Sequence, residues 1–300
     1  VGMDKKGEID YLSKIIQPDV SVITNINYAH IKNFKNIKHI ALAKSEIIQN
    51  TNPGGYVILN ADDNFFSFHK KKVIENNLKL ISFGIKNKQS NIKFLDIKKK
   101  KDHFQLWIQI NKVKKYFLVS NNFQNNIYNI LAALAVISIY KNILQLDKNI
   151  FFKFKVPQGR GDISKINFLK KNINLVDESY NSNPLSLKSA VLNYDKIKTK
   201  KNKKYLLLGD MLELGDHAKK LHESLAATIN KTKINKVFIK GHYMKYMFKK
   251  LADSKKGRVL YNKSQIIDLI RNDLNNNDSL MVKASNATGF NKMIKEIKRK

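Results

Sequence analysis

Short apolar runs with strand character alternate along this chain with segments of helical periodicity, and this order restricts the folds that the chain can adopt. In the first half, helices are expected at residues 7–16 and 37–49, and strands at 19–24, 56–60 and 78–83. In the second half, strands are expected at residues 174–177, 205–208, 236–239 and 279–283, and helices at 186–194, 217–229, 266–274 and 289–300. Because parallel strands are joined by crossovers that are usually helices, this order predicts an α/β fold with mostly parallel sheets.

The pattern changes between residues 92 and 119, where apolar and polar residues alternate in two short segments separated by a charged turn. Strict alternation is typical of half-buried antiparallel strands, so we expect a β-rich insertion in the first domain. A strongly apolar helix is then predicted at residues 126–140. The best linker candidate is Pro157-Gln-Gly-Arg-Gly161, which predicts two domains at residues 1–156 and 157–300.

The formal net charge is +32, from 56 basic and 24 acidic residues. A basic surface can bind nucleic acid, but here the lysines are spread over the whole chain together with abundant Asn and Ile, as expected from an AT-rich genome. We therefore expect no nucleic-acid partner. The chain has no cysteine, which excludes disulfides and thiolate metal sites. No apolar run is long enough to span a bilayer, and residues 1–20 have no secretory signal layout. A cytoplasmic location and a monomeric state are expected.

The stretch at residues 22–48 combines a strand, its polar end and a helix that carries Lys44. Thr24 and Asn25 follow the strand, and His30 lies just beyond them. Because ligands of open α/β sheets bind outside the carboxyl ends of the strands, His30 and Lys44 are expected to face one cleft. Taken alone, a single histidine is more often structural, and a single lysine in a lysine-rich chain is more often solvated.

Similar polar clusters follow other predicted strands, and they include Asn60-Ala-Asp-Asp63, Asp177-Glu-Ser-Tyr-Asn-Ser-Asn-Pro184, Gly209-Asp-Met-Leu-Glu-Leu-Gly215 and Lys283-Ala-Ser285. Each cluster is compatible with an ordinary turn, since Asn, Asp, Gly and Ser favour turns. Their recurrence at successive strand ends favours an interdomain cleft that binds phosphate or carboxylate groups. Neither GxGxxG nor GxxxxGK[ST] occurs, so a dinucleotide-binding Rossmann site is not supported.

In this order, the motifs resemble those of the Mur ligases. The similarity begins with Val22-Ile-Thr-Asn-Ile-Asn-Tyr-Ala-His30 and Ala43-Lys-Ser-Glu-Ile47, and it extends through Asn126-Ile-Tyr-Asn129, Gly159-Arg160 and the clusters named above. Each motif is modest by itself, but the ordered set covers essentially the whole chain. The resemblance implies a central ATP-binding domain that is incomplete at its N-terminus, followed by a Rossmann-like C-terminal domain.

The resemblance also implies an ATP-dependent amide ligase of peptidoglycan precursor synthesis that works through an acyl phosphate and requires Mg²⁺. The Tyr-Asn-x-Asn-Pro and Gly-Asp-Met-x-Glu-Leu-Gly forms point to the member that adds D-Ala-D-Ala to a UDP-N-acetylmuramoyl-tripeptide. His30 matches a magnesium ligand, and Lys44 matches a lysine that is carbamylated in the family. The implied ATP contacts are Asn25, Asn126, Asn129, Arg160 and Asp177. The implied substrate contacts are Tyr180, Asn181, Asn183, Lys283 and Ser285.

Several departures from the family pattern leave alternatives open. The P-loop Gly-Thr-Asn-Gly-Lys-[Ser/Thr] is absent and would lie before Val1, which suggests part of a longer enzyme or a broken gene. Phe123, Asn125 and Asn286 replace Gly, His and Arg of the family. The alternatives are a sibling Mur ligase, a folylpolyglutamate synthase, an inactive remnant, or a basic nucleic-acid-binding protein with a degraded ligase fold.

The remaining histidines are predicted to have structural roles. We expect surface or turn positions for His39, His69, His103, His217 and His242. His222 is expected to cap or pack its helix. Glu213 is expected either to form a hydrogen bond within its loop or to contact substrate, and the sequence favours neither role.

Overall fold

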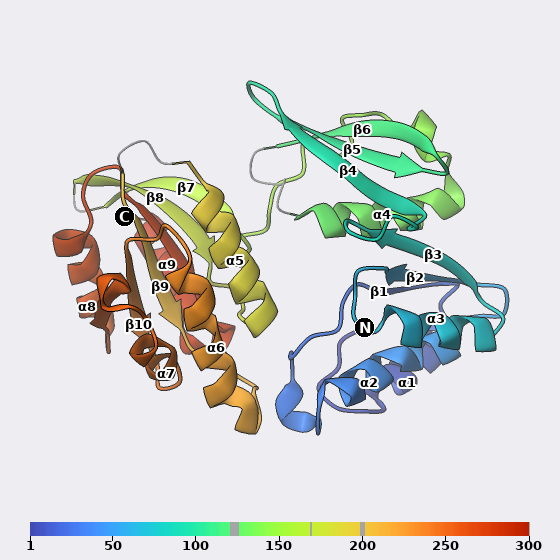
Figure 1. Ribbon diagram of the computed structural model, residues 1–300, viewed down its shortest axis with the longest axis horizontal. Coiled ribbons are helices and arrows are strands. Elements are labelled where there is room, and N and C mark those ends of the chain that lie inside the picture. Colours follow the sequence, from blue (N-terminus) through green and yellow to red (C-terminus); the bar gives the residue numbers. More distant parts are fainter. Residues whose placement is uncertain (121–125, 169, 199–201, 300) are drawn as a thin grey trace. The chain divides into compact units, whose positions relative to one another are not determined.

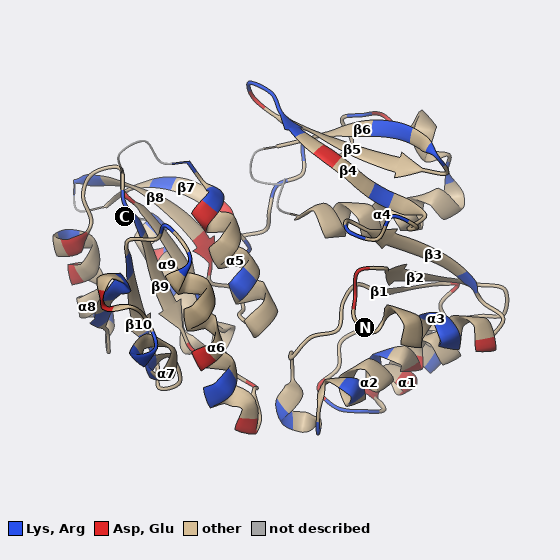
Figure 2. Ribbon diagram, in the orientation of Figure 1, with Lys and Arg blue, Asp and Glu red and all other residues tan. Residues whose placement is uncertain are grey.

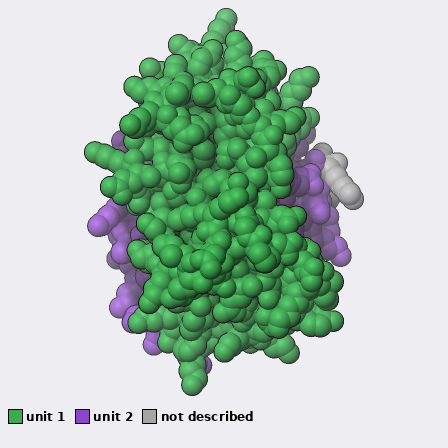
Figure 3. All heavy atoms as spheres, turned by 90° about the vertical axis from the view of Figure 1, so that its right-hand side faces the viewer, with its two compact units in different colours: residues 1–155 green, residues 156–300 purple. Residues whose placement is uncertain are grey.

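The computed structural model describes residues 1–120, 126–168, 170–198 and 202–299. Contacts divide the chain into two compact units, Val1–Lys155 and Val156–Lys300, which Figure 3 colours separately. The sequence placed the boundary after Val156. In the described part of the chain, no helix combines the length and the apolar character needed to cross a bilayer. Lysine and arginine are distributed over helices, strands and loops of both units (Figure 2).

Unit 1 contains a six-stranded sheet with the order β1-β2-β3-β4-β5-β6 (Figure 1). The strands are β1 (Val20–Ile23), β2 (Tyr56–Asn60), β3 (Lys79–Gly84), β4 (Ile92–Lys99), β5 (Phe104–Ile110) and β6 (Val113–Val119). Neighbouring strands from β1 to β4 run parallel, whereas β5 runs antiparallel to both of its neighbours, β4 and β6. The β-rich insertion therefore extends the parallel sheet, which it joins through the pairs Phe83–Ile92 and Gly84–Lys93.

The helices of unit 1 pack on both faces of this sheet (Figure 1). They are α1 (Glu8–Ile16), α2 (Ile37–Gln49), α3 (Phe66–Glu75) and α4 (Ile127–Tyr140), with short 3-10 turns η1 (Ile31–Asn33) and η3 (Ile143–Gln145). The small residues of α4, Ala132 and Ala135, are buried against the strands in one hydrophobic core. Alternate residues of β5 point into the same core, as the alternating sequence predicts.

Unit 2 has a second six-stranded sheet, with the order β11-β10-β9-β12-β8-β7. Its strands are β7 (Asp162–Phe168), β8 (Lys171–Glu178), β9 (Lys204–Gly209), β10 (Lys236–Lys240), β11 (Lys256–Val259) and β12 (Ser279–Lys283). All neighbours are parallel except the edge strand β7, which is antiparallel to β8. The predicted α/β class, with a β-rich insertion and a Rossmann-like second domain, is confirmed.

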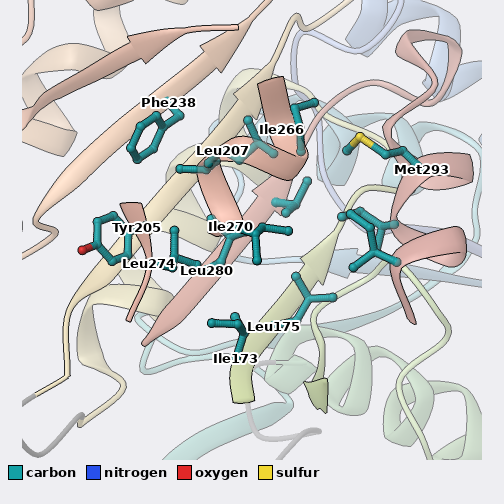
Figure 4. Close-up of a cluster of buried hydrophobic side chains, with 14 of the residues drawn as sticks. Ile173, Leu175, Tyr205, Leu207, Phe238, Ile266, Ile270, Leu274, Leu280 and Met293 are labelled. Atoms are coloured by element: carbon teal, nitrogen blue, oxygen red, sulfur yellow. The ribbon is translucent and has the colours of Figure 1, made fainter. Parts of the chain in front are cut away.

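The helices of unit 2 are α5 (Pro184–Lys196), α6 (Ala218–Asn230), α7 (Met244–Lys249), α8 (Lys263–Asp268) and α9 (Phe290–Arg299), with 3-10 turns η4 (Gly215–His217), η5 (Asp253–Lys255) and η7 (Asn286–Thr288). A hydrophobic core forms where side chains of the central strands, such as Leu207 and Leu280, meet Ile266, Ile270 and Met293 from the helices (Figure 4). The helix predicted at residues 266–274 begins earlier and continues into a π-helical turn, η6 (Leu269–Asp273).

One prediction about a histidine is wrong. His69 is only 2% exposed, and its Nε2 lies 3.1 Å from the carbonyl oxygen of Ala41 on α2. It occupies the inner face of α3, a helix that the sequence analysis did not predict. Burial lowers the pKa of this imidazole, so the neutral ring is favoured within the core.

Candidate functional site

A pocket of about 300 Å³ in unit 1 contains both His30 and Lys44. It lies at the carboxyl end of β1 and is lined by Val1, Gly2, Met3, Ile9, Val22, Ile23, Thr24, Ala29, His30, Lys44 and Ile47. The strand supplies its last residues to the wall, and α2 supplies Lys44. The two residues that the sequence assigned to one cleft therefore share one pocket.

Lys44 lies on the side of α2 that faces the end of β1. Its Nζ donates a hydrogen bond of 3.0 Å to the carbonyl oxygen of Asn25. Burial lowers the pKa of the Lys44 ammonium, while the Asp63 carboxylate partly opposes this shift. A lysine in this environment loses its proton more readily than a solvated lysine, which increases its ability to act as a nucleophile.

His30 has a left-handed backbone conformation, with φ of 59°, where the loop after β1 enters η1. Its Nδ1 lies 3.3 Å from a carboxylate oxygen of Asp4. A carboxylate at one ring nitrogen orients a histidine whose other nitrogen binds a metal. This arrangement is compatible with the predicted role of His30 as a ligand.

Asn60 is the last residue of β2, Asp62 and Asp63 follow it, and all three bind neighbouring loops of unit 1. The amide of Asn60 donates to the carbonyl oxygen of Thr24 at 3.0 Å, and Asp63 accepts a hydrogen bond from the backbone of Ile26 at 2.8 Å. Asp62 accepts from the backbone amides of residues 85–87 and from the hydroxyl of Tyr128. The two aspartates thus fix the loop positions within unit 1.

The candidate adenine contacts lie at the beginning of α4. Asn126 is the N-cap residue, and Asn129 donates to its side-chain oxygen at 3.2 Å. Tyr128 lies between them and contacts Asp62 at 2.9 Å, which connects this end of α4 to the loop after β2. The departures at Phe123 and Asn125 lie outside the described residues.

In unit 2, Arg160, Tyr180 and Lys283 lie around the loop that follows β8. The guanidinium group of Arg160 stacks over the Tyr180 ring at 4.1 Å. The Lys283 ammonium is 3.2 Å from the Glu178 carboxylate and 2.9 Å from the carbonyl oxygen of Asn181. Burial lowers the pKa of Lys283, the Glu178 carboxylate opposes this shift, and the Arg160 charge adds to it.

Asp177 is 3% exposed, and its carboxylate is engaged within unit 2. One oxygen accepts hydrogen bonds from the backbone and hydroxyl of Ser179, and the other contacts the Lys298 ammonium at 2.7 Å. Lys298 also pairs with Asp162 on β7, so α9 is held against the β-hairpin. A nucleotide contact by Asp177 stays a prediction that would require these bonds to be shared or exchanged.

Three predicted substrate residues also form bonds within unit 2. Asn183 is the N-cap of α5 and forms a capping box with Ser186. The side-chain oxygen of Asn181 accepts from the backbone of Ser182 at 2.8 Å. Ser285 is 4% exposed, and its hydroxyl donates to the carbonyl oxygen of Ser182 while accepting from the backbone of Leu212. Asn286, which replaces the family arginine, is exposed.

Sequence reasoning did not identify Glu178, Lys298 or Tyr128 as parts of these clusters. Glu178 and Tyr128 lie inside motifs whose neighbouring residues were predicted to bind ligands, so these motifs could have identified them. For Lys298 no local signal existed, because it is one lysine in a basic helix and its partner Asp177 is 121 residues away.

Two family models match the chain. The Mur ligase middle domain matches residues 1–137, and the domain described as Mur ligase, glutamate ligase domain matches residues 165–286. The chain belongs to the Mur ligase family.

Among curated members of the Mur ligase family, this chain is similar to several named UDP-N-acetylmuramoyl-tripeptide–D-alanyl-D-alanine ligase. The relative from Buchnera aphidicola subsp. Acyrthosiphon pisum is 32% identical over 99% of this chain and 64% of that protein. The relative from Bacillus subtilis is 26% identical over 99% of this chain and 63% of that protein. The chain thus spans a little under two thirds of the length of these Mur ligases.

Solved Mur ligase structures share the fold. A structure of MurF from Acinetobacter baumannii matches with a TM-score of 0.84 at 22% identity, over 100% of this chain and 64% of that one. A structure of MurF ligase from Thermotoga maritima in complex with ADP matches with a TM-score of 0.83 at 19% identity, over 98% of this chain and 65% of that one.

Proposed function

We propose that this Mur ligase chain is the catalytic part of an ATP-dependent ligase that joins D-Ala-D-Ala to a UDP-N-acetylmuramoyl-tripeptide. The observation that carries the proposal is the pocket shared by His30 and Lys44 at the carboxyl end of β1. The names of the similar curated proteins supply the substrates, and the ADP complex of a structural neighbour supports a nucleotide. The cytoplasmic location and the monomeric state stay predictions.

In the proposed reaction, the tripeptide carboxylate attacks the γ-phosphorus of ATP, and ADP leaves. The amine of the dipeptide then attacks the acyl carbon, phosphate leaves, and the amine loses a proton as the amide forms. Such phosphoryl chemistry depends mainly on positioning and on neutralisation of charge. In unit 2, Arg160 and Lys283 are cationic groups suited to this neutralisation, and Tyr180 supports the Arg160 guanidinium.

The donors of the unit 1 pocket fit a magnesium ion. Formation of a carbamate requires the neutral amine of Lys44, and burial shifts the Lys44 pKa in the direction that favours this form. The carbamate would offer oxygen ligands, which Mg²⁺ prefers, and His30 would add a ring nitrogen oriented by Asp4. A bound magnesium ion would supply charge neutralisation at the phosphates.

The test is an assay of ADP release by the gene product that contains these 300 residues. We expect release only when ATP, the UDP-tripeptide and D-Ala-D-Ala are all present. Without the UDP-tripeptide or without D-Ala-D-Ala, we expect only the background rate of ADP release. The dipeptide L-Ala-L-Ala serves as a control of matched size. If a single amino acid supported ADP release as well as D-Ala-D-Ala does, the chain would be assigned to a sibling Mur ligase instead of a dipeptide-adding ligase. No release with any of these amines would overturn the ligase assignment.

A further inference from the structure

A pocket of about 260 Å³ lies in unit 2 at the carboxyl end of β10. It is bounded by Lys240, the last residue of that strand, by residues of α8 and α9, and by Thr288 and Gly289 between β12 and α9. In open α/β sheets, ligands bind outside the carboxyl ends of the strands. The pocket therefore has the position expected of a binding site, and none of its residues belongs to the sites described above.

Three lysines from separate elements surround this pocket, together with one glutamate. Lys240 ends β10, Lys263 begins α8, and Lys292 lies in the first turn of α9. Glu296 pairs with Lys263, so the four groups have a net formal charge of +2. Within the described residues, no carboxylate contacts the ammonium group of Lys240 or of Lys292.

Other shielded lysines of unit 2 have carboxylate partners. Lys204 and Lys283 are 7% and 2% exposed, and their ammonium groups lie 3.8 and 3.2 Å from carboxylate oxygens. Lys240 is also partly buried, but its ammonium group lies over the ring of Phe290, 5.7 Å from the ring centre. A ring face attracts a cation without neutralising its charge. The pocket thus gathers positive charge that the described part of unit 2 does not compensate.

The pocket also has an apolar floor. Ile266 of α8 and Phe290 and Met293 of α9 line it, and they are 1%, 2% and 9% exposed, respectively. All three belong to the hydrophobic core of unit 2, in which Figure 4 labels Ile266 and Met293. Because close packing fixes the elements that a core joins, the three lysines originate from fixed positions around the pocket.

We propose that this pocket binds a phosphate group, either as the free ion or as the phosphomonoester of a small organic molecule. A phosphomonoester carries a charge of about −1.5 to −2 at pH 7, which matches the charge of the lining, whereas a monocarboxylate would leave one lysine uncompensated. Lysine binds phosphate as a point charge. The apolar floor fits the organic part of an ester, and the volume lies below the range of about 300–1,000 Å³ that is usual for ligand pockets, so that part is small.

The inference goes beyond the proposed function, since no step of that reaction uses these residues. Its test uses the gene product that contains these 300 residues, labelled with ¹³C at the methionine methyl groups and titrated with inorganic phosphate at constant ionic strength. Met293 lines this pocket and Met3 lines the pocket of unit 1, so two methyl signals report on the two sites separately. The variants Met293→Leu and Met3→Leu assign these signals.

We expect the Met293 signal to shift saturably, with a dissociation constant for phosphate of about 1 mM or below. A shift of the Met3 signal alone would overturn the proposal. So would an equal shift of the Met293 signal when chloride replaces phosphate at the same ionic strength, because screening by any anion would then explain the effect.

Substitution of single lysines identifies the groups that hold the phosphate. Lys240→Gln and Lys292→Gln should each weaken phosphate binding by at least about fivefold, since each removes one charged donor that is partly open to solvent. The matched control is Lys236→Gln, which removes the same charge from a partly buried residue at the opposite end of β10 and should leave the affinity unchanged. Equal affinities in the wild type and all three variants would contradict the assignment.

A stability measurement separates a binding site from a purely structural cluster. In phosphate-free buffer, Lys240→Gln should unfold at the same urea concentration as the wild type or at a higher one, because it relieves repulsion between like charges. Added phosphate should stabilise the wild type more than the variant, since a ligand stabilises the state that binds it. A variant that is less stable without phosphate, and that responds to phosphate as the wild type does, would overturn the binding role of Lys240.

Two further titrations at the same ionic strength identify the source of the phosphate. Tighter binding of glycerol 3-phosphate than of inorganic phosphate would identify a phosphomonoester as the ligand, and the reverse order would identify the free ion. Succinate carries two carboxylates on a short apolar chain and is the competing anion. If succinate bound as tightly as either phosphate compound, the assignment to phosphate would be wrong.

Discussion

Each unit has a lysine beside its candidate site that is shielded from solvent, fully in unit 2 and partly in unit 1, and the two lysines have different partners. Lys283 in unit 2 is 2% exposed, and its ammonium contacts the Glu178 carboxylate as well as the Asn181 carbonyl oxygen. Lys44 in unit 1 is half-buried, and within the described residues its one hydrogen bond goes to the carbonyl oxygen of Asn25. Burial lowers the pKa of both groups, but a carboxylate in direct contact opposes the shift only at Lys283.

This difference concerns the contacts of the two ammonium groups, because one has a carboxylate partner and the other has a neutral acceptor. A buried ammonium paired with a carboxylate remains protonated and contributes a fixed positive charge. A buried lysine with weaker compensation exposes a neutral amine more often, which is the form that reacts with carbon dioxide. The comparison supports the proposed roles, in which Lys283 supplies a fixed charge and Lys44 is the site of carbamate formation.

The largest expected effect comes from Lys44→Ala. We expect the rate of ligation to fall by about 10³-fold or more, since charge stabilisation at the phosphates is lost. The melting temperature should change little, because a half-buried lysine with one neutral acceptor contributes little to stability. Lys38→Ala, at an exposed position in the first turn of the same helix, is the matched control.

A readout independent of turnover is available for the same variant. With ¹³C-bicarbonate, the wild type should show a carbamate carbon signal that Lys44→Ala lacks and Lys38→Ala retains. Wild-type rates in Lys44→Ala, or bicarbonate-dependent recovery of its activity, would contradict the role of a carbamate on Lys44.

The next largest effect is expected from Lys283→Met, and it concerns stability. Loss of the ammonium leaves the Glu178 carboxylate without its partner, which should lower the free energy of unfolding by about 2–4 kcal/mol, somewhat less than for a fully buried pair. The double variant Lys283→Met with Glu178→Gln should recover most of this loss in urea unfolding. Equal losses in the single and double variants would mean that the pair is not coupled.

A smaller effect is expected in the pH dependence of stability, measured in buffer free of carbon dioxide. Because the folded pKa of Lys44 is lowered, the unfolded chain binds more protons between that value and about 10.4. The stability of the wild type relative to Lys44→Met should therefore rise as the pH increases through this window. The Glu178→Gln substitution should steepen the rise of stability with pH that Lys283 contributes and leave the contribution of Lys44 unchanged. If both contributions changed, the two lysines would not differ in their coupling to Glu178.

The smallest effect is expected from Tyr128→Phe, which removes the hydrogen bond to Asp62. The half-exposed position limits the loss of unfolding free energy to about 0.5–1 kcal/mol. If Tyr128 helps to place the beginning of α4 for adenine, the KM for ATP should also rise a few-fold. Tyr140→Phe, at the exposed opposite end of the same helix, is the control.

The sequence predicted elements whose pattern is internal to one segment. The helix expected at residues 126–140 is α4, since its residues are almost all apolar, and the alternating run at 104–110 is β5. Elements with weak internal patterns were not predicted. In α3 three successive lysines interrupt the apolar positions, so its helix depends on packing of His69 and Val73, and β11 is a short, largely polar edge strand.

For the candidate sites, motifs identified the right loops but not the bonds of each residue. Asp177 and Ser285 were selected as ligand contacts, whereas their side chains bind Lys298 and Leu212, which lie 121 and 73 residues away. Nothing in the neighbouring sequence encodes such a distant partner.

By itself, the sequence determined the α/β class, the order of the elements and the membership of the Mur ligase family, because periodicity and motif order are properties of the chain. Only the tertiary structure decided which lysine has a carboxylate in contact and which lysines gather around one pocket. The physical reason is that the charge state of a buried group depends on the solvent it has lost and on the partners that surround it. Both are set when strands and helices that are distant in sequence pack together.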